Sequence, residues 1–351
     1  MRSSTTRITF GALALRPGGS GVQTYIRELL KELPNHISHV ELSALVQRDA
    51  VPDVPGVIAS QQRPVSNGVV RTAFGLAPEM SADVFHGLDV DLPLVTRSFT
   101  VATVHDTSVI DMPAASSWLR AKGEQQLVRR TLRKADLLLA VSDFTAERIE
   151  AISGRSATVV ELAPASWARP PTAAEVQAVR TKYQLPERFV LQVGTVEPRK
   201  YVSLVACASA DLGLPFVLAG AGSCGPAAPR SAIGLGYVDT ADLPGLYAAA
   251  TITAYASKYE GYGLPPVEAM ACGGAVVASA VGALPQVVGD GAVLVRSHRV
   301  EDWVAAMRPV AFDAATRAEL TSAALSVAGT MSWARTAERT AWAYRDAGFA
   351  L

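Results

Sequence analysis

This sequence contains few cysteines and few aromatic residues, and neither sign of charge is in excess. It has three cysteines, and none forms a Cys-x-x-Cys pair that would indicate a zinc or redox site. Its 32 basic and 32 acidic residues cancel, so net charge gives no reason to expect nucleic acid or an anionic membrane as a partner. No apolar run approaches the ~20 residues of a membrane span. We therefore expect a cytoplasmic protein with reduced thiols that acts on small molecules.

Apolar residues, by contrast, are abundant, at 49% of a chain of 351 residues. This length and content exceed what one hydrophobic core usually organises, and they predict two domains. The apolar stretch of residues 8–15 follows a basic residue but is short and lacks a cleavage site. We interpret it as a first β-strand and not as a leader.

Runs typical of strands alternate along the chain with helical patterns, which is typical of parallel α/β layering. In residues 22–33 apolar side chains recur at helical spacing, and Pro34 ends the pattern. Strands are expected at residues 8–15, 40–46, 99–104, 137–141, 189–194, 216–219, 251–255, 275–278 and 292–295. The alternation predicts an α/β fold with Rossmann-like parallel sheets.

A proline-rich segment, residues 163–172, interrupts this alternation. We therefore place the domain junction there and predict two Rossmann-like lobes, at 1–167 and 168–332. The remaining residues, 333–351, are expected to form a helix that crosses back to the first lobe.

The most informative segment is SKYEGYGLPPVEAMACGG, residues 257–274. A helix is expected to begin at about Pro265 or Pro266, because proline suits the first turn. The amides just before it would lie at the positive end of that helix, where phosphate binds. These amides belong to Gly261, Tyr262, Gly263 and Leu264. Glu268 in the first turn is expected to accept hydrogen bonds from a ribose diol, and Glu260 to face a sugar.

In this glycine- and proline-rich context, Glu260 and Glu268 resemble the Glu-x7-Glu signature of glycosyltransferase family 4. The resemblance implies a retaining glycosyltransferase of the GT-B type, with two Rossmann-like lobes facing across a cleft. It implies a hexosyltransferase that moves a sugar from a nucleotide diphospho-sugar to a hydroxyl acceptor. In the family the second glutamate binds the ribose and the first lies near the donor sugar, roles that the resemblance gives to Glu268 and Glu260.

A second motif, VGTVEPRK at residues 193–200, is placed where the first strand of the second lobe gives way to a helix. It resembles the family's Glu-Pro-Arg-Lys motif, whose arginine and lysine hold the donor diphosphate. That role falls to Arg199 and Lys200, with Gly194 as a further donor contact. A guanidinium fork and an ammonium point charge complement each other around a pyrophosphate. The family usually has asparagine next, whereas Tyr201 stands here.

The first lobe contributes a glycine turn and a histidine. The turn, residues 18–21, matches neither the P-loop nor the dinucleotide fingerprint. Its position resembles the family's turn at the donor phosphate, which makes Gly19 and Gly21 candidate donor contacts; a purely structural turn is the alternative. His105 follows a predicted strand, at the sheet edge where ligands bind. The family's histidine at a similar strand end touches the donor sugar, a role implied for His105, with Asp106 a weaker candidate.

Two further positions need a separate interpretation. Asp89 and Asp91 form an Asp-x-Asp pattern, the manganese motif of the other large glycosyltransferase fold, but so short a pattern is common by chance. We interpret it as an acceptor-side loop and expect no metal and no cofactor beyond the nucleotide-sugar co-substrate. Gln286 stands where the family commonly has glutamate.

The expected acceptor is a small-molecule natural product or a polysaccharide intermediate, because the Ala- and Arg-rich composition is typical of a high-GC bacterium. Three alternatives stay open. Two have the same fold: a nucleotide-sugar epimerase, and an enzyme that makes a non-glycosidic bond to a sugar-like ring. The third is a nucleotide-sugar-binding protein without catalytic activity.

Overall fold

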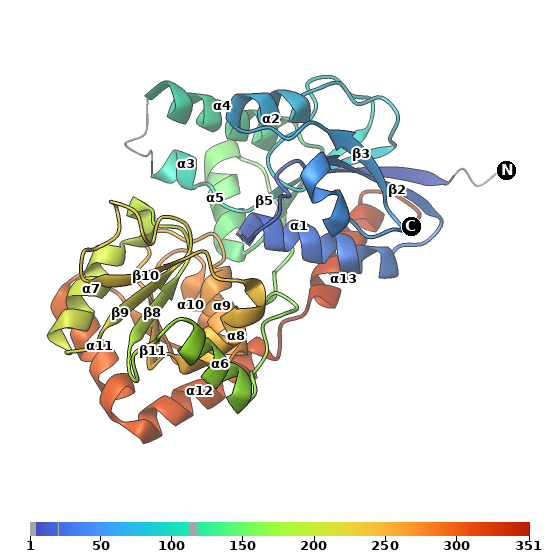
Figure 1. Cartoon of the computed structure of the whole chain (residues 1–351). Helices are drawn as coiled ribbons and strands as arrows, with labels where there is room; N and C mark the ends of the chain where they lie inside the picture. Colours follow the sequence, from blue (N-terminus) through green and yellow to red (C-terminus); the bar gives the residue numbers. More distant parts are fainter. Residues whose placement is uncertain (1–4, 20, 113–117) are drawn as a thin grey trace. The chain divides into compact units, whose positions relative to one another are not determined.

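The computed structural model describes residues 5–19, 21–112 and 118–351 and divides into two compact units (Figure 1). The first unit comprises Met1–Leu162 together with Trp333–Leu351, and the second is Ala163–Ser332. Each unit is built around one parallel sheet. The predicted fold class, α/β with two Rossmann-like parallel sheets, is confirmed.

The first unit contains a seven-stranded sheet in the order β3-β2-β1-β4-β5-β6-β7. Its strands are β1 (Thr6–Gly11), β2 (Val40–Gln47), β3 (Ala59–Arg63), β4 (Val84–Gly87), β5 (Phe99–Val104), β6 (Leu137–Ala140) and β7 (Thr158–Val159). The order reverses between β1 and β4, which pair in parallel with Ile8 opposite Val84. In an open sheet, ligands bind beyond the carboxyl ends of the strands at such a reversal.

The helices of the first unit cover this sheet. They are α1 (Gly21–Glu32), α2 (Gly68–Gly75), α3 (Ser108–Asp111), α4 (Trp118–Lys134), α5 (Asp143–Ser153) and α13 (Trp333–Asp346). In α1 the predicted apolar face is buried, with Tyr25, Ile26 and Leu29 fully inaccessible. Ser142 caps α5 by accepting a hydrogen bond from the amide of Thr145 at 3.1 Å, as its sequence position indicates.

A buried chain of hydrogen bonds fastens α13 to the sheet of the first unit. Tyr344 of α13 lies 2.6 Å from His86 Nδ1, and His86 Nε2 lies 2.8 Å from the Thr103 hydroxyl. That hydroxyl in turn lies 2.8 Å from the Tyr25 hydroxyl of α1. Burial, with a smaller contribution from His105, lowers the pKa of His86 to about 3. His86 is therefore neutral, and the chain joins α13 to three elements of the first unit without burying a charge.

The second unit contains a six-stranded parallel sheet in the order β10-β9-β8-β11-β12-β13. Its strands are β8 (Val190–Val193), β9 (Phe216–Ala219), β10 (Ala232–Gly236), β11 (Ile252–Tyr255), β12 (Val276–Ser279) and β13 (Ala292–Val295). Its helices are α6 (Ala173–Lys182), α7 (Val202–Asp211), α8 (Leu243–Ala249), α9 (Leu264–Ala271), α10 (Leu284–Val288), α11 (Val300–Phe312) and α12 (Ala314–Ala328). The order reverses between β8 and β11, which repeats the arrangement of the first unit.

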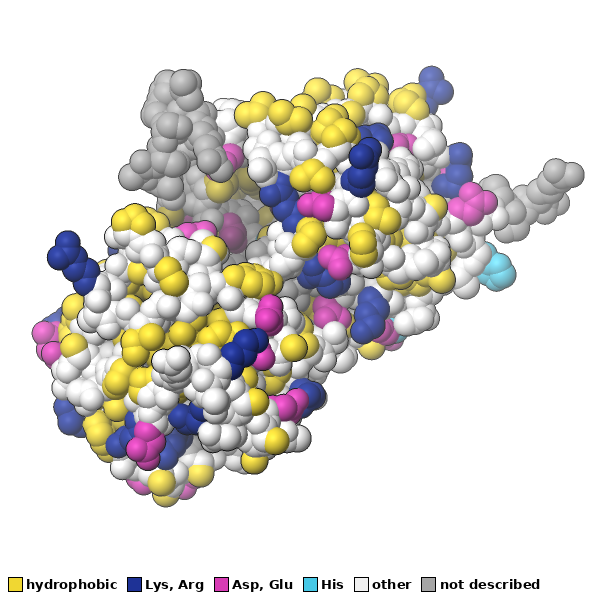
Figure 2. Space-filling model, in the orientation of Figure 1, with side chains coloured by type: hydrophobic (Ala, Val, Ile, Leu, Met, Phe, Trp, Pro, Cys, Tyr) yellow, Lys and Arg dark blue, Asp and Glu magenta, His cyan; other side chains and the backbone are white. Residues whose placement is uncertain are grey.

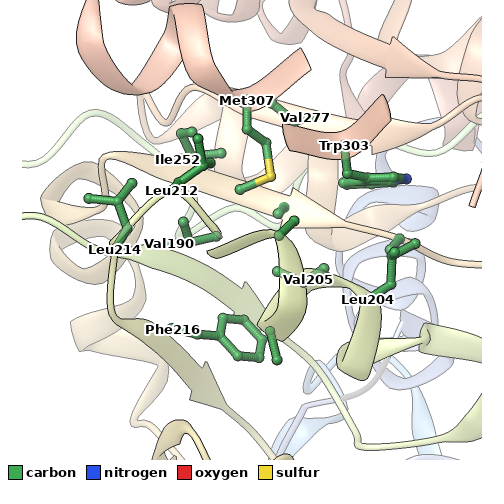
Figure 3. Packing of buried hydrophobic residues seen from close by; sticks show 14 of the residues in the cluster. Val190, Leu204, Val205, Leu212, Leu214, Phe216, Ile252, Val277, Trp303 and Met307 are labelled. Carbon is green, nitrogen blue, oxygen red and sulfur yellow. The ribbon is translucent and has the colours of Figure 1, made fainter. Parts of the chain in front are cut away.

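The core of the second unit lies between its strands and the helices α7 and α11 (Figure 3). Val190, Phe216 and Ile252 extend from the strands, while Trp303 and Met307 pack on them from α11. Strands that are buried on both faces have continuous apolar sequences, and such strands of this sheet could therefore be predicted from the sequence.

Several boundaries differ from those predicted. The first strand ends at Gly11 and not at residue 15, because the chain turns there, with the Leu15 amide donating to the Ala12 carbonyl at 3.0 Å. Leu15 is nevertheless fully buried, so its apolar character reflects a buried turn. Helix α9 begins at Leu264, just before the predicted prolines. Among the described residues, no helix is both long and apolar enough to cross a bilayer.

Candidate functional site

Two loops of the second unit meet where its strand order reverses. One follows β8 and contains the 3₁₀ turn Pro198–Lys200, and the other follows β11 and leads to α9. They are neighbours because β11 pairs directly with β8, with Ile252 opposite Val190. The backbone joins them further out, where the Lys258 amide donates to the Arg199 carbonyl at 2.8 Å.

An ion cluster links these two loops. The Lys200 ammonium donates to Oε1 of Glu260 at 2.5 Å, and a guanidinium nitrogen of Arg199 lies 3.2 Å from Oε2. The Ser257 hydroxyl also donates to Oε1, at 2.7 Å. Arg199 is anchored in addition by donating to the Tyr259 carbonyl at 2.8 Å. The sequence motifs of the two loops thus form a single cluster of two cations and one carboxylate.

The carboxylate of Glu260 is ionised in this setting. Burial raises its pKa, but the charges of Lys200 and Arg199 and the hydrogen bonds from Lys200 and Ser257 outweigh burial, so its pKa lies below the ordinary glutamate value. A group with a lowered pKa is a poor proton donor at neutral pH. Glu260 therefore pairs with both cations as a carboxylate, a contact that the sequence did not reveal.

The close approach of a third loop explains Gly282. A Cβ atom at this position would lie 2.2 Å from the carbonyl oxygen of Glu260, and its φ of +55° is in the left-handed region. The Ala283 amide donates to that same carbonyl at 3.0 Å. The backbone of Glu260 is thereby held from one side while its side chain is held by Lys200 from the other.

The loop before α9 would contact a ligand mainly through its backbone amides. Gly263 caps the helix at φ +103°, and a Cβ atom there would lie 2.4 Å from Leu284. Tyr262 and Leu264 are buried, and the Tyr262 hydroxyl donates to the Met331 sulfur at 3.9 Å. Gly261, Tyr262 and Gly263 lead into α9, which begins at Leu264 and whose first amides favour an anion.

Glu268 lies one turn into α9 and is also buried. Burial and the neighbouring Tyr255 phenol raise the pKa of Tyr247, and the charge of Glu268 adds a smaller contribution in the same direction. Gly194 directly follows β8 and has open space around a Cβ atom, but its φ of +142° is one that other residues rarely adopt, so the backbone conformation and not packing favours glycine there. Gln286 lies on the exposed side of α10.

Tyr201, the departure from the expected asparagine, has an unusual backbone. Its φ of 43° and ψ of 45° are left-handed, a region in which asparagine is tolerated far better than most side chains. The Lys258 ammonium lies 4.0 Å from the centre of its ring, and the His298 ring lies 5.7 Å away. Tyr201 thus keeps the backbone shape that asparagine would adopt and adds aromatic contacts to the loop carrying Glu260.

This geometry predicts opposite outcomes for two substitutions of Tyr201. Tyr201→Asn is expected to keep the left-handed turn, whereas Tyr201→Val is expected to be less stable than Tyr201→Asn by about 1–2 kcal/mol, because a β-branched residue is strained there. Urea denaturation of both variants measures the difference. Equal stability of the two would show that the left-handed conformation is not retained in solution.

In the first unit, the described residues of the glycine turn lie beside α1. Gly19 is exposed with open space around it, and Gly21 begins α1, whereas Ser20 between them lies outside the described residues. Helix α1 also brings Tyr25 against His105, with ring centres 4.8 Å apart in an edge-on arrangement. The turn and the histidine therefore belong to the same edge of the first sheet.

His105 directly follows β5, as predicted, and is partly buried. Its Nε2 lies 2.9 Å from the Leu88 carbonyl oxygen, which can only accept, so Nε2 carries the hydrogen and Nδ1 is the acceptor in the neutral ring. Asp106 accepts from the amide and the hydroxyl of Ser108, at 2.9 and 2.6 Å. Asp106 therefore shapes the start of α3.

Asp89 and Asp91 follow β4 and face a cation. Arg71 of α2 lies 3.9 Å from Asp89 and 3.7 Å from Asp91. Burial and the charge of Asp89 raise the pKa of Asp91 to about 6, although Arg71 opposes them. The described residues include no group of three or more His, Cys, Asp or Glu side chains placed to hold a metal ion.

The raised pKa of Asp91 predicts a pH-dependent stability. The folded chain binds this proton more tightly than the unfolded chain, whose carboxyl titrates near 3.8, so stability falls as pH rises from about 4 to about 6. Asp91→Asn removes that loss and is expected to stabilise the protein by on the order of 2 kcal/mol at pH 7, but little at pH 4. Urea denaturation at both values measures this, and an equal effect at both would contradict it.

The structure thus brings Arg199, Lys200 and Glu260 together in the second unit and places His105 beside α1 in the first. Two residues that contact the candidate site residues were not predicted from the sequence. Ser257 lies three residues before the first glutamate of Glu-x7-Glu, and its contact with Glu260 depends on how the loop folds back. Arg71 belongs to a short helix, α2, that the sequence pattern did not predict.

Comparisons with known proteins agree with this architecture. Residues 177–326 match the family model described as glycosyl transferases group 1. The O-antigen chain mannosyltransferase B of Escherichia coli is 32% identical over 282 residues, which cover 75% of this chain and 74% of that protein.

Solved structures show the same fold. Sucrose-phosphate synthase from Thermosynechococcus elongatus is similar with a TM-score of 0.76 at 18% identity, over 97% of this chain and 99% of that one. Anabaena HepE, solved in complex with UDP-glucose, is similar with a TM-score of 0.73 at 17% identity, over 97% and 99% of the two chains. Both likenesses show the GT-B architecture.

Proposed function

This chain belongs to the glycosyl transferases group 1, and from that premise we propose that it is a retaining hexosyltransferase of the family 4 type, using a nucleotide diphospho-sugar as donor. The observation that carries the proposal is the cluster of Arg199, Lys200 and Glu260 beside the amino end of α9. Two cations and a row of helix-start amides at a reversal of strand order suit a diphosphate. The UDP-glucose bound by HepE supports this class of donor.

In this proposal the second unit binds the donor. Arg199 and Lys200 grip the diphosphate, with the backbone of Gly194, Gly261 and Gly263 alongside. Glu268 accepts hydrogen bonds from the ribose diol. The first unit supplies Gly19, Gly21 and His105 as further donor contacts and otherwise serves the acceptor.

The chemistry follows from charge. When the bond between the sugar and the diphosphate breaks, negative charge grows on the leaving group, and the cations of Arg199 and Lys200 stabilise it. Each such group contributes ~10²–10³ in rate. The sugar acquires oxocarbenium character, and the acceptor hydroxyl attacks on the face from which the diphosphate departs, so the new C–O bond keeps the configuration of the broken one. The hydroxyl proton passes to the leaving phosphate, so no protein base is required. Since side chains supply the countercharge, the proposed reaction requires no metal or other cofactor.

We place the reaction in the cytoplasm, acting on a hydroxyl of a small molecule or glycan. Cys207, Cys224 and Cys272 are all free thiols, which agrees with a reducing compartment.

A thermal-shift panel of UDP, GDP, ADP and dTDP tests the donor site. A nucleotide at 100 times its dissociation constant stabilises the protein by ~2.7 kcal/mol, and we expect one of the four to do so. If none binds, the proposed donor class is wrong.

Activity assays separate the alternatives. Conversion of a donor sugar without any acceptor would indicate an epimerase of the same fold. Nucleotide binding without turnover across a panel of donors and acceptors would indicate a non-catalytic binding protein. Transfer to an acceptor with retained configuration supports the proposal.

A further inference from the structure

Exposed apolar side chains gather on one part of the first unit. Of the eleven large hydrophobic residues exposed in the described part of the chain, six lie between residues 65 and 95, and Val69 is 85% exposed. We call these six residues the apolar edge: Val65, Val69, Val70, Met80, Leu94 and Val95. Figure 2 shows hydrophobic side chains collected over the part of the first unit where α2 lies.

The backbone holds the apolar edge together. The Leu94 amide donates to the Leu76 carbonyl at 2.9 Å, directly after α2, and the Glu79 amide donates to the Val95 carbonyl at 3.1 Å. These contacts bring the two segments that carry Met80, Leu94 and Val95 side by side at the end of the helix that carries Val69. Contiguous exposed apolar surface of this kind marks an interaction site.

Positive charge borders the apolar edge. Arg130 of α4 donates to the carbonyls of Leu92 and Pro93 at 3.0 and 2.7 Å, which places α4 directly beside Leu94. Arg129 and Arg133 are exposed on α4, and helical spacing puts them next to Arg130 on the same side of the helix. The balanced charge of the whole chain therefore conceals a local basic stripe.

We propose that the first unit docks on an anionic lipid bilayer, with the apolar edge entering the head-group region and the arginines of α4 lying over lipid phosphates. Apolar side chains flanked by arginine suit this interface because the bilayer offers hydrocarbon and negative charge together. A water-soluble acidic partner would pair with the arginines of α4 but would give the six exposed side chains of the apolar edge no apolar surface to contact.

The docked face adjoins the proposed acceptor side. Arg71 lies on α2 between Val70 and the carboxylates of Asp89 and Asp91, which follow β4 at the strand-order reversal. Together with the proposed transferase function, on which this step rests, docking makes the acceptor a membrane-borne molecule with a free hydroxyl. The binding itself needs neither donor nor turnover.

Vesicle co-sedimentation of the full chain tests the proposal. We expect binding to vesicles of phosphatidylcholine with phosphatidylglycerol, weakened at high salt, and about tenfold or more weaker binding to phosphatidylcholine alone. The double substitutions Leu94→Gln with Val95→Gln, and Arg129→Gln with Arg133→Gln, are each expected to weaken binding about tenfold. Trp342→Gln is the matched control, because Trp342 is 54% exposed in the same unit but lies on α13.

The outcomes are decisive because the variants change surface residues only. Binding lost in both double variants and kept in Trp342→Gln supports a docked bilayer. Absence of vesicle binding overturns the proposal, and so does a concentration-dependent dimer abolished by the Leu94 and Val95 substitutions, since the apolar edge would then cover a second copy. Nucleotide thermal shifts measured on the same proteins report separately on the donor site.

Discussion

Replacing Lys200 with alanine is expected to lower kcat by ~10²-fold or more while the fold persists. The ammonium is the closest cation to Glu260 and, in the proposed reaction, neutralises the departing diphosphate. Glu260 keeps Arg199 and Ser257 as partners at 3.2 and 2.7 Å, so the remaining cluster stays paired. Steady-state kinetics with the donor identified by the nucleotide panel measures the loss.

Lys258→Ala provides the control for Lys200→Ala. Lys258 lies in the neighbouring loop and places its ammonium over the ring of Tyr201, 4.0 Å from the ring centre. Its removal is expected to change kcat by no more than a few-fold, because a cation–π contact of this kind contributes about 0.5–1 kcal/mol. Near-normal turnover of Lys200→Ala would overturn the assigned role of Lys200.

Replacing Glu260 with alanine is expected to cost stability as well as activity. It leaves Lys200, whose side chain is 12% exposed, beside Arg199 with no carboxylate between them. Removing one partner of a buried ion pair costs about 2–4 kcal/mol when the remaining charge keeps some contact with water. Urea denaturation of the variant measures the loss, and added pyrophosphate is expected to recover part of it by supplying the missing anion.

Glu197→Ala is the matched comparison for Glu260→Ala. Glu197 also pairs with Arg199, at 3.5 Å, but its side chain is 46% exposed. Exposed pairs contribute about 0–1 kcal/mol, so little change in stability is expected. If both variants lose the same stability, burial of the Glu260 pair is not what stabilises the loops.

The sheets were largely predictable from the sequence, whereas short elements were not. Buried parallel strands such as β9 and β12 appear as uninterrupted apolar runs. Strand β4, with four residues, is too short to show a period, and its His86 reads as polar although it is fully buried. Backbone pairing with β1 and β5 places β4 in the sheet, and the buried His86 ring is satisfied by Thr103 and Tyr344, which only the folded chain brings near.

Motif resemblance selected the residues of the candidate site but not their arrangement. It selected Arg199, Lys200 and Glu260, yet Lys200 and Glu260 are 60 positions apart. Their contact requires that β11 lie against β8, although β9 and β10 follow β8 along the chain. Tyr201 was visible as a departure from asparagine, but the backbone conformation common to both residues could be read only from its dihedral angles.

The carboxylate held between Arg199 and Lys200 also bears on how a reaction cycle would end. A site that grips a nucleoside diphosphate with two bare cations risks being inhibited by its own product. Here Glu260 is a tethered anion that competes for the same two cations and never diffuses away. In the proposed reaction, each departing nucleotide would leave its two cations to a carboxylate that is already in place, which favours release and keeps the charges that help the bond to break.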